Sequence, residues 1–175
     1  MNGIKIELRK SLPPKDALND LLSQHYKLAV QRMRDLGFEI DPAAPRSAMA
    51  EFWKNADDYL PPKGCLVVAR NSSGAIVGCA MMKRFDDQTG EIKRVFVTDD
   101  TRGTGTGRKL TETCEKTARS MGLKRLIADS LTSNVEMRGL LPKLGFVALD
   151  TPIESSSYKD QPMLRPHLHY FTKDI

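Results

Sequence analysis

A short glycine-rich segment near the middle of the chain restricts the fold more than any other feature of the sequence. Residues 102–108 read Arg-Gly-Thr-Gly-Thr-Gly-Arg and lie between a stretch that predicts a strand and a periodic stretch that predicts a helix. Glycine has no Cβ, so its backbone N–H can approach a ligand closely. The start of a helix adds unpaired N–H donors and a partial positive charge. The segment therefore predicts a strand–turn–helix unit that binds a phosphate group.

Two other kinds of phosphate-binding loop fit this segment poorly. A Walker loop needs Gly-Lys followed by Ser or Thr, whereas Gly107 precedes Arg108 and Lys109. A dinucleotide-binding fingerprint needs Gly-x-Gly-x-x-Gly after the first strand of a βαβ unit. Here the spacing is Gly-x-Gly-x-Gly, and the segment follows several predicted strands. We therefore expect a different phosphate compound.

The positive charge of the chain is concentrated in the same region. Residues 101–125 hold seven Lys or Arg and two acids, and 7 − 2 = +5 equals the net charge of the whole chain. A local surplus of this kind favours an anionic ligand, although a solvated helix face would carry many of the same charges. The region has no Phe, Tyr or Trp to stack on bases, so we expect no nucleic-acid partner.

The cysteines and the apolar runs indicate where such a chain works. Cys65, Cys79 and Cys114 are an odd number in no metal-ligand spacing, which predicts buried, reduced thiols and no metal site. Reduced thiols are typical of a cytoplasmic protein. No apolar run approaches the ~18 residues of a membrane span, so we expect no membrane partner.

The remaining sequence predicts a mixed α/β domain with a central sheet. Apolar residues alternate or run together in the predicted strands and recur every three or four residues in the predicted helices. Ser47 and Ser133 are the expected N-caps of two helices, and Glu136 would complete a capping box with Ser133. The stretch Asp150–Pro166, with three consecutive serines, predicts a long loop. The predicted strands are 4–8, 65–69, 76–82, 91–97, 126–128, 146–149 and 167–172, and the predicted helices are 18–36, 47–59, 105–121 and 134–144.

Several features, in the right order, resemble the GNAT N-acetyltransferase superfamily. Arg102-x-x-Gly105-x-Gly107 matches the family motif (Gln/Arg)-x-x-Gly-x-(Gly/Ala), and Glu91–Val97 resembles the family's central strand. Leu144-Gly145-Phe146 resembles a signature that follows the last helix, and Asn134 an asparagine that precedes it. The resemblance covers roughly residues 64–149. It implies one N-acetyltransferase domain over residues 1–175, with a mixed, mostly antiparallel sheet that is splayed at its central strands and flanked by about four helices.

The resemblance also implies that acetyl-CoA or coenzyme A binds as co-substrate, with no metal. The backbone N–H groups of the glycine-rich segment would hold the pyrophosphate. The pantetheine would pair with the central strand like an added β-strand, and a backbone N–H nearby would polarise the thioester carbonyl. The expected cofactor-binding residues are Phe96, Val97, Arg102, Gly103, Thr104, Gly105, Thr106, Gly107, Arg108 and Asn134.

Two catalytic roles are expected from the resemblance. Glu91 lies where several family members keep a general base, and burial near an apolar pantetheine would raise its pKa. A salt bridge at the end of a strand is the alternative role for Glu91. The tyrosine that often protonates the leaving thiolate is replaced by Leu141. Tyr158 or Tyr170 could supply the proton instead, and Tyr158, in the long loop, is the first candidate; the thiolate could also leave without help.

The sequence thus predicts a cytoplasmic N-acetyltransferase that transfers acetyl from acetyl-CoA to the primary amine of a small molecule or an amino-acid-like substrate. Family members also form homodimers. Two alternatives stay open: a protein acetyltransferase acting on lysine or an N-terminus, and a non-catalytic acyl-CoA-binding module, which the missing tyrosine would suit. Residues 38–62 and 150–166 would border the acceptor site, and lid-like packing there would favour a small substrate.

Overall fold

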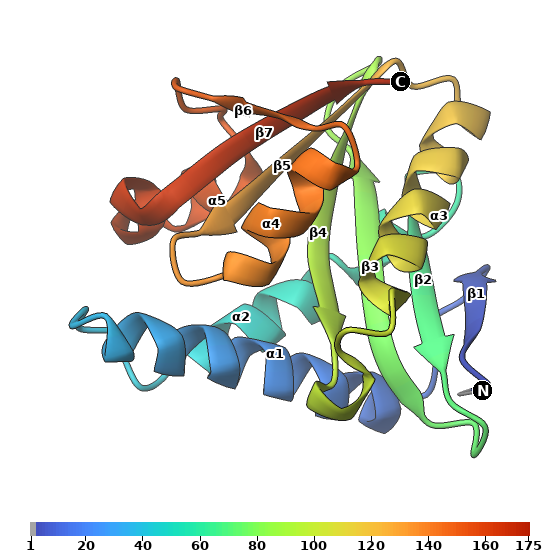
Figure 1. Cartoon of the computed structure of the whole chain (residues 1–175), viewed down its shortest axis with the longest axis horizontal. Helices are drawn as coiled ribbons and strands as arrows, with labels where there is room; N and C mark the ends of the chain where they lie inside the picture. Colours follow the sequence, from blue (N-terminus) through green and yellow to red (C-terminus); the bar gives the residue numbers. More distant parts are fainter. Residues whose placement is uncertain (1–2) are drawn as a thin grey trace.

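A seven-stranded mixed sheet forms the centre of the molecule in the computed structural model, which describes residues 3–175 (Figure 1). Neighbouring strands follow the order β1-β2-β3-β4-β5-β7-β6, and every pair is antiparallel except β4 and β5. The predicted α/β fold class is therefore confirmed. The strands are β1 Lys5–Arg9, β2 Gly64–Arg70, β3 Ile76–Arg84, β4 Thr89–Val97, β5 Arg125–Leu131, β6 Val147–Leu149 and β7 Leu168–Asp174.

Helices cover both faces of this sheet and give it two hydrophobic cores (Figure 1). One core lies between the sheet and helices α3 and α4, where Leu110 and Leu141 are completely buried. The other lies between the sheet and helices α1 and α2, where Leu18 and Phe52 are completely buried. The helices are α1 Lys15–Asp35, α2 Ala44–Lys54, α3 Thr106–Ser120, α4 Val135–Lys143 and α5 Ser156–Asp160, with 3-10 turns η1 Ala56–Tyr59, η2 Asp99–Thr101 and η3 Pro162–His167.

The sheet divides at its centre. The parallel pairing of β4 with β5 ends at Ile92 and Ala128, so the second half of β4 pairs only with β3. A β-bulge lies just beyond this point, where Arg94 and Val95 stand opposite Ala80 alone. Arg94 has φ 50° and is the one non-glycine residue among residues 3–175 with a positive φ. A left-handed conformation costs a non-glycine residue on the order of 1–2 kcal/mol, which the packing of β4 has to offset.

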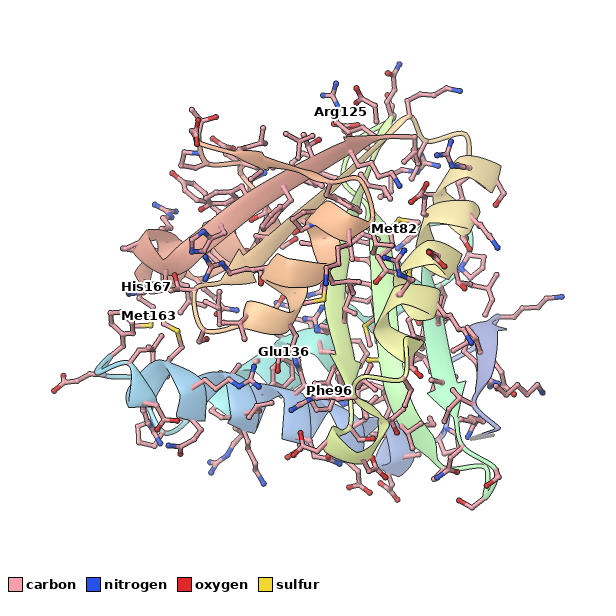
Figure 2. All side chains as sticks on the ribbon, viewed as in Figure 1. Met82, Phe96, Arg125, Glu136, Met163 and His167 are labelled. Atoms are coloured by element: carbon pink, nitrogen blue, oxygen red, sulfur yellow. The ribbon has the colours of Figure 1, made fainter. Side chains whose placement is uncertain are left out.

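Three local predictions were wrong. Helix α2 begins at Ala44, with Pro45 in its first turn, so Ser47 lies inside it rather than at its cap. Asn134, not Ser133, caps α4: its Oδ1 accepts the Met137 N–H at 3.2 Å. Glu136 is held by Arg32 of α1 instead of completing a capping box, with Nη1 and Nη2 each 2.6 Å from its carboxylate (Figure 2).

The segment predicted as a long loop is partly helical. Ser155 caps the short helix α5 by accepting the Tyr158 N–H at 3.2 Å, and η3 follows directly. His167, predicted in the last strand, belongs to η3, and its ring packs against Phe38 with the ring centres 4.0 Å apart. Figure 2 shows Met163 and His167 beside the end of α1. The C-terminal segment therefore reaches back to the helices that precede β2.

Candidate active site

The glycine-rich turn presents backbone amides to an open space. Gly103 and Gly105 have φ 77° and 81°, and a Cβ on either would meet no atom within 4 Å. Gly105 is the N-cap of α3, and no side chain bonds to the amides of the first turn. The first intrahelical bond of α3 runs from the Lys109 N–H to the Gly105 carbonyl, so the amides just before it lack helical partners. The amides at the start of α3 are therefore unpaired within residues 3–175, and their role as a phosphate cradle stays a prediction.

The side chains of this turn are mostly engaged by the protein itself. Arg102 folds back, with Nε 3.3 Å from the Val97 carbonyl and an ion pair to Asp99. Arg108 lies between Glu112, at 3.2 Å, and the Lys143 carbonyl, at 3.4 Å. The backbone amides before Lys109 lack helical partners, whereas each of these two guanidinium groups has part of its five N–H groups engaged by the protein. The Thr104 and Thr106 hydroxyls, 2.7 Å apart, bond to each other.

The edge of β4 that faces β5 is left without a strand partner beyond Ile92. Phe96 and Val97 lie on this part of the strand, next to the glycine-rich turn, as the sequence predicted. On β5, the Ser130 side chain lies on the same face as Leu126 and Ala128, toward α3 and α4. Ser130 is 5% exposed, and its hydroxyl has no hydrogen-bond partner within residues 3–175. The gap between β4 and β5 therefore offers both backbone and side-chain hydrogen-bonding groups.

Glu91 is completely buried on the opposite face of β4, in the half that still pairs with β5. Its carboxylate accepts hydrogen bonds from the Ser156 N–H at 2.9 Å and the Ser156 hydroxyl at 2.6 Å, and it lies 3.3 Å from the Lys93 ammonium. Burial raises the pKa of Glu91, but Lys93 and the two bonds from Ser156 outweigh it and hold the pKa below the usual 4.5. This is the reverse of the predicted direction. Glu91 is therefore ionised at neutral pH.

A second carboxylate, Asp129 on β5, was not singled out from the sequence. It accepts hydrogen bonds from the Ser155 hydroxyl at 2.5 Å and the Ser157 hydroxyl at 3.2 Å. Together with Ser156, these serines fasten α5 to both central strands. The segment thus packs like a lid over the face of the sheet that carries Glu91. The three consecutive serines were visible in the sequence, but their hydrogen-bond partners lie 26 to 65 residues away, so the contacts could not be predicted from the local sequence.

The two candidate proton donors lie together on this face. Tyr158 is on α5, its ring 6.4 Å from that of Tyr170 and 4.2 Å from the Arg165 guanidinium. Tyr170 lies on β7 opposite Asp129, and its buried hydroxyl has no hydrogen-bond partner within the described chain. Burial raises the pKa of Tyr170, so its phenol stays protonated at neutral pH. Leu141 is completely buried in the α3–α4 core.

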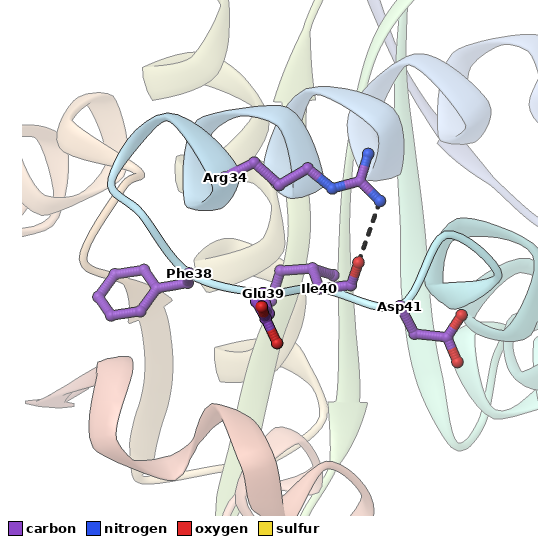
Figure 3. Close-up of a pocket in the computed structure, with 5 residues that line it drawn as sticks. All are labelled: Arg34, Phe38, Glu39, Ile40 and Asp41. Carbon is purple, nitrogen blue, oxygen red and sulfur yellow. Dashed lines mark hydrogen bonds between the residues drawn. The ribbon is translucent and has the colours of Figure 1, made fainter.

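Two hollows on the surface lie apart from these groups. One, of about 590 Å³, is lined by Arg34 and residues 38–41 (Figure 3). The Arg34 side chain lies along this hollow and donates a hydrogen bond to the Ile40 carbonyl at 3.0 Å. The other, of about 600 Å³, lies between α1 and α2 and is lined by Lys27 and Arg46 among others. Neither hollow is lined by Glu91 or the glycine-rich turn, and we give neither a catalytic role.

Comparison with known families agrees with this geometry. Residues 25–146 match the family model described as the acetyltransferase (GNAT) family. The chain belongs to this family. The matched range contains the divided strands, the glycine-rich turn and Glu91, so the predicted resemblance is confirmed.

None of the helices in residues 3–175 combines the length and the apolar character that crossing a membrane requires.

Two curated GNAT relatives match part of the chain. An IAA acetyltransferase of Azospirillum brasilense is 38% identical over 81 residues, which are 46% of this chain and 52% of that protein. An uncharacterised N-acetyltransferase of Schizosaccharomyces pombe is 27% identical over 103 residues, 54% of this chain and 63% of that protein. The chain therefore spans between half and two thirds of the length of these relatives.

Solved GNAT structures share the fold over almost the whole chain. An acetyltransferase of Streptococcus agalactiae superposes with a TM-score of 0.73 at 18% identity and covers 97% of this chain and 98% of its own. A GNAT acetyltransferase of Elizabethkingia anophelis, solved with acetyl-CoA bound, has a TM-score of 0.63 at 20% identity, with 98% of each chain covered. At such identities the likeness concerns the fold alone.

The pKa of Glu91 should depend on Lys93. In Lys93→Met the nearest ammonium is lost, burial dominates, and the pKa of Glu91 should rise. A carboxylate with a lowered pKa stabilises the fold above its unfolded pKa of about 4.3 and loses this contribution as pH falls through its folded pKa. The stability deficit of Lys93→Met should therefore be larger at pH 7 than at pH 3. Carboxyl ¹³C titration, with Glu91→Gln for assignment, and urea unfolding at both pH values measure the two effects.

Lys63→Met is the control for this experiment, because it removes an exposed ion pair with Asp58. It should leave the titration of Glu91 unchanged. An unaltered pKa of Glu91 in Lys93→Met would show that the Ser156 bonds alone keep the carboxylate ionised.

Proposed function

We propose that this GNAT protein transfers an acetyl group from acetyl-CoA to the primary amine of a small molecule or an amino-acid-like substrate. One observation carries the proposal: a divided pair of strands lies beside an uncapped, glycine-rich helix start, and a buried, ionised carboxylate lies on the far face. The first two features suit a phosphopantetheine ligand. The third suits an amine that must lose a proton before it attacks the thioester.

Coenzyme A would bind along the open side of β4. The amides of residues 103–108 would hold the pyrophosphate, since unpaired N–H groups at a helix start favour anions. The pantetheine amides would pair with Phe96 and Val97, which have no strand partner on this edge. For the Val97 carbonyl to be used, Arg102 has to turn away from it, and its guanidinium then becomes free to meet phosphate. The Ser130 hydroxyl and the Asn134 side-chain amide are further donors at the gap.

The acceptor would occupy the face that carries Glu91. A carboxylate ionised at neutral pH can take the amine proton, directly or through one water, while a backbone N–H at the bulge polarises the thioester carbonyl. The packing of α5 against β4 and β5 supports a small acceptor over a peptide, because a lid fastened by Ser155, Ser156 and Ser157 covers Glu91 on this side. The protein acetyltransferase alternative is thus less well supported.

Tyr158 is the proposed donor to the leaving thiolate, because it lies on α5 over the site and Leu141 has no proton to give. Tyr170 is the alternative, since its phenol is buried, protonated and without a hydrogen-bond partner within residues 3–175. A thiol has a pKa of about 8.5, so the thiolate is already a fair leaving group, and the contribution of a phenol donor is lost at alkaline pH as the phenol itself ionises. In a non-catalytic acyl-CoA-binding module, Glu91 would only pair with Lys93 and fasten Ser156 of α5.

Gly105→Glu should abolish coenzyme A binding. The new side chain fills the open space in front of the turn with a negative charge, and repulsion of several kcal/mol weakens affinity by at least about 100-fold. Gly74→Glu is the matched control, because Gly74 also has a positive φ, 85°, and no atom within 4 Å, but lies in the β2–β3 turn. Calorimetry should find native affinity in the control. Equal affinity in the two variants would remove the turn from the binding site.

Glu91→Gln should lower kcat by roughly 10²–10⁴-fold, the usual cost of losing a general base, and leave the Kd for acetyl-CoA nearly unchanged. Glu115→Gln is the control: this carboxylate also bonds a lysine and an arginine, but on the outer side of α3 and β7. Steady-state release of free thiol, with calorimetry for binding, measures both. A near-native kcat at neutral pH in Glu91→Gln would mean that the amine is deprotonated by another group.

Tyr158→Phe should lower the maximal rate most at neutral pH, where the native phenol still holds its proton, and should remove the alkaline limb of the pH–rate profile, because no phenol is left to lose a proton. Tyr170→Phe is the matched comparison, because it deletes the other phenol of the pair and keeps its ring. If Tyr170→Phe alone loses activity with an intact fold, Tyr170 is the donor. Unchanged profiles in both variants would show that the thiolate leaves without a tyrosine.

A further inference from the structure

The β-bulge of β4 carries a guanidinium whose charge no acid neutralises within residues 3–175. Arg94 donates from Nε to the Tyr26 hydroxyl at 2.7 Å and from Nη1 to the Tyr59 hydroxyl at 2.6 Å. Neither Asp nor Glu forms an ion pair with it in the described chain. By contrast, Lys93, its neighbour on the same strand, is paired with Glu91. Arg94 is therefore a cation held in place by neutral groups.

The surroundings of Arg94 are aromatic. The guanidinium carbon lies 5.2 Å from the ring centres of both Phe52 and Tyr59. His25 packs on Tyr26 and Phe96, and burial lowers the pKa of His25 to about 4, so it is neutral at pH 7. Aromatic faces and phenols stabilise a guanidinium and fix its orientation, but they do not supply the negative charge that a partly buried cation calls for.

The free donors of Arg94 form a fork that fits a carboxylate. A guanidinium has five N–H groups, and the two phenols use the Nε–H and one proton of Nη1. The second proton of Nη1 and both protons of Nη2 remain. These two nitrogens form the end-on fork that binds a carboxylate through two parallel hydrogen bonds. A lysine could not reproduce this geometry.

The position of Arg94 relates this fork to the proposed reaction. Glu91, Lys93 and Phe96 project toward the α1–α2 and α5 face, whereas Ile92, Val95 and Val97 contribute to the α3–α4 core. The bulge places Arg94 on the first face, because it inserts one residue into the alternation. Arg94 lies three positions after Glu91, which is roughly 10 Å of extended backbone. An amino acid can bridge a distance of this order when its carboxylate binds the Arg94 guanidinium and its amine reaches Glu91 directly or through one water.

We propose that Arg94 is the anchor for a carboxylate of the acceptor, so that the substrate is an amine that also carries a carboxylate, an amino acid or a close analogue. This inference rests on the proposed acetyl transfer and adds the chemical class of the acceptor. Tyr26 and Tyr59 are positioning residues, since they aim the guanidinium. The left-handed backbone of Arg94 turns its side chain toward them and away from the pantetheine side of the strand.

The test compares free amino acids with their amides. Acetyl transfer from acetyl-CoA is measured by thiol release for L-amino acids and the corresponding L-amino-acid amides. The native protein should prefer the acid by about 10- to 100-fold in kcat/KM, the effect of one charged, two-bond contact. R94Q should lose this preference through KM for the acid, while kcat/KM for the amide and the Kd for acetyl-CoA stay near native. R94K should restore only part of the preference.

Arg84→Gln is the matched control, because Arg84, like Arg94, bonds only to neutral oxygens within residues 3–175, here the carbonyls of Asp87 and Met121, and it lies at the far end of β3. If R94Q does not fold, Y26F provides the same test by removing one phenol that aims the guanidinium. Equal use of acids and amides by the native protein, or an equal loss of both in R94Q, would overturn the carboxylate site and leave acetyl transfer intact.

A binding measurement keeps the two proposals distinguishable. Calorimetry in the presence of coenzyme A compares N-acetyl amino acids with N-acetyl amino-acid amides and needs no turnover. Tighter binding of the acids to the native protein, lost in R94Q, supports the carboxylate site even if no amine is acetylated, in which case only the transfer proposal fails. Equal binding of acids and amides rejects the carboxylate site.

Discussion

The parting of β4 from β5 is the constraint on which the rest of the structure depends. Backbone N–H and C=O groups in a sheet need partners, and an open edge in the middle of a sheet is costly unless something else pairs with it. Here β4 is held to β3 on one side and packed by cores on both faces, so it cannot close the gap. The bulge at Arg94 turns the strand further and distributes its side chains between two faces. The proposed cofactor edge, the proposed acceptor face and the direction of Arg94 all depend on this one departure from regular pairing.

Local features of the chain predicted the parts of the site that local chemistry decides. The turn with Gly103 and Gly105 before a helix was readable because the spacing of its glycines fits the Walker loop and the dinucleotide fingerprint poorly. The period of apolar residues located every strand and the four longer helices. Glu91 was singled out by its place on the strand that resembles the family's central strand. The direction of its pKa shift was not predicted, because Lys93 and Ser156 oppose the effect of burial, and only the fold brings Ser156 close to Glu91.

Features that depend on distant partners escaped prediction. Helix α5 has five residues and no apolar face, and it is stabilised largely by bonds to Asp129 and Glu91 rather than by its own sequence. Glu136 satisfied the pattern of a capping box, but Arg32 offers it a stronger, doubly bonded partner. Arg94 gave no signal, because an arginine in a strand is ordinary until the bulge and two tyrosines define its role.

The three serines of α5 have a mechanical consequence. They tie one rigid piece of chain to Glu91 on β4 and to Asp129 on β5, at the level where these strands begin to diverge. A helix that is bonded to two diverging strands is sensitive to the distance between these strands. A ligand that binds between β4 and β5 on one face of the sheet would lengthen or shorten the serine bonds on the other face. Binding in the gap would thereby affect the segment that covers the opposite face, without any residue that touches both ligands.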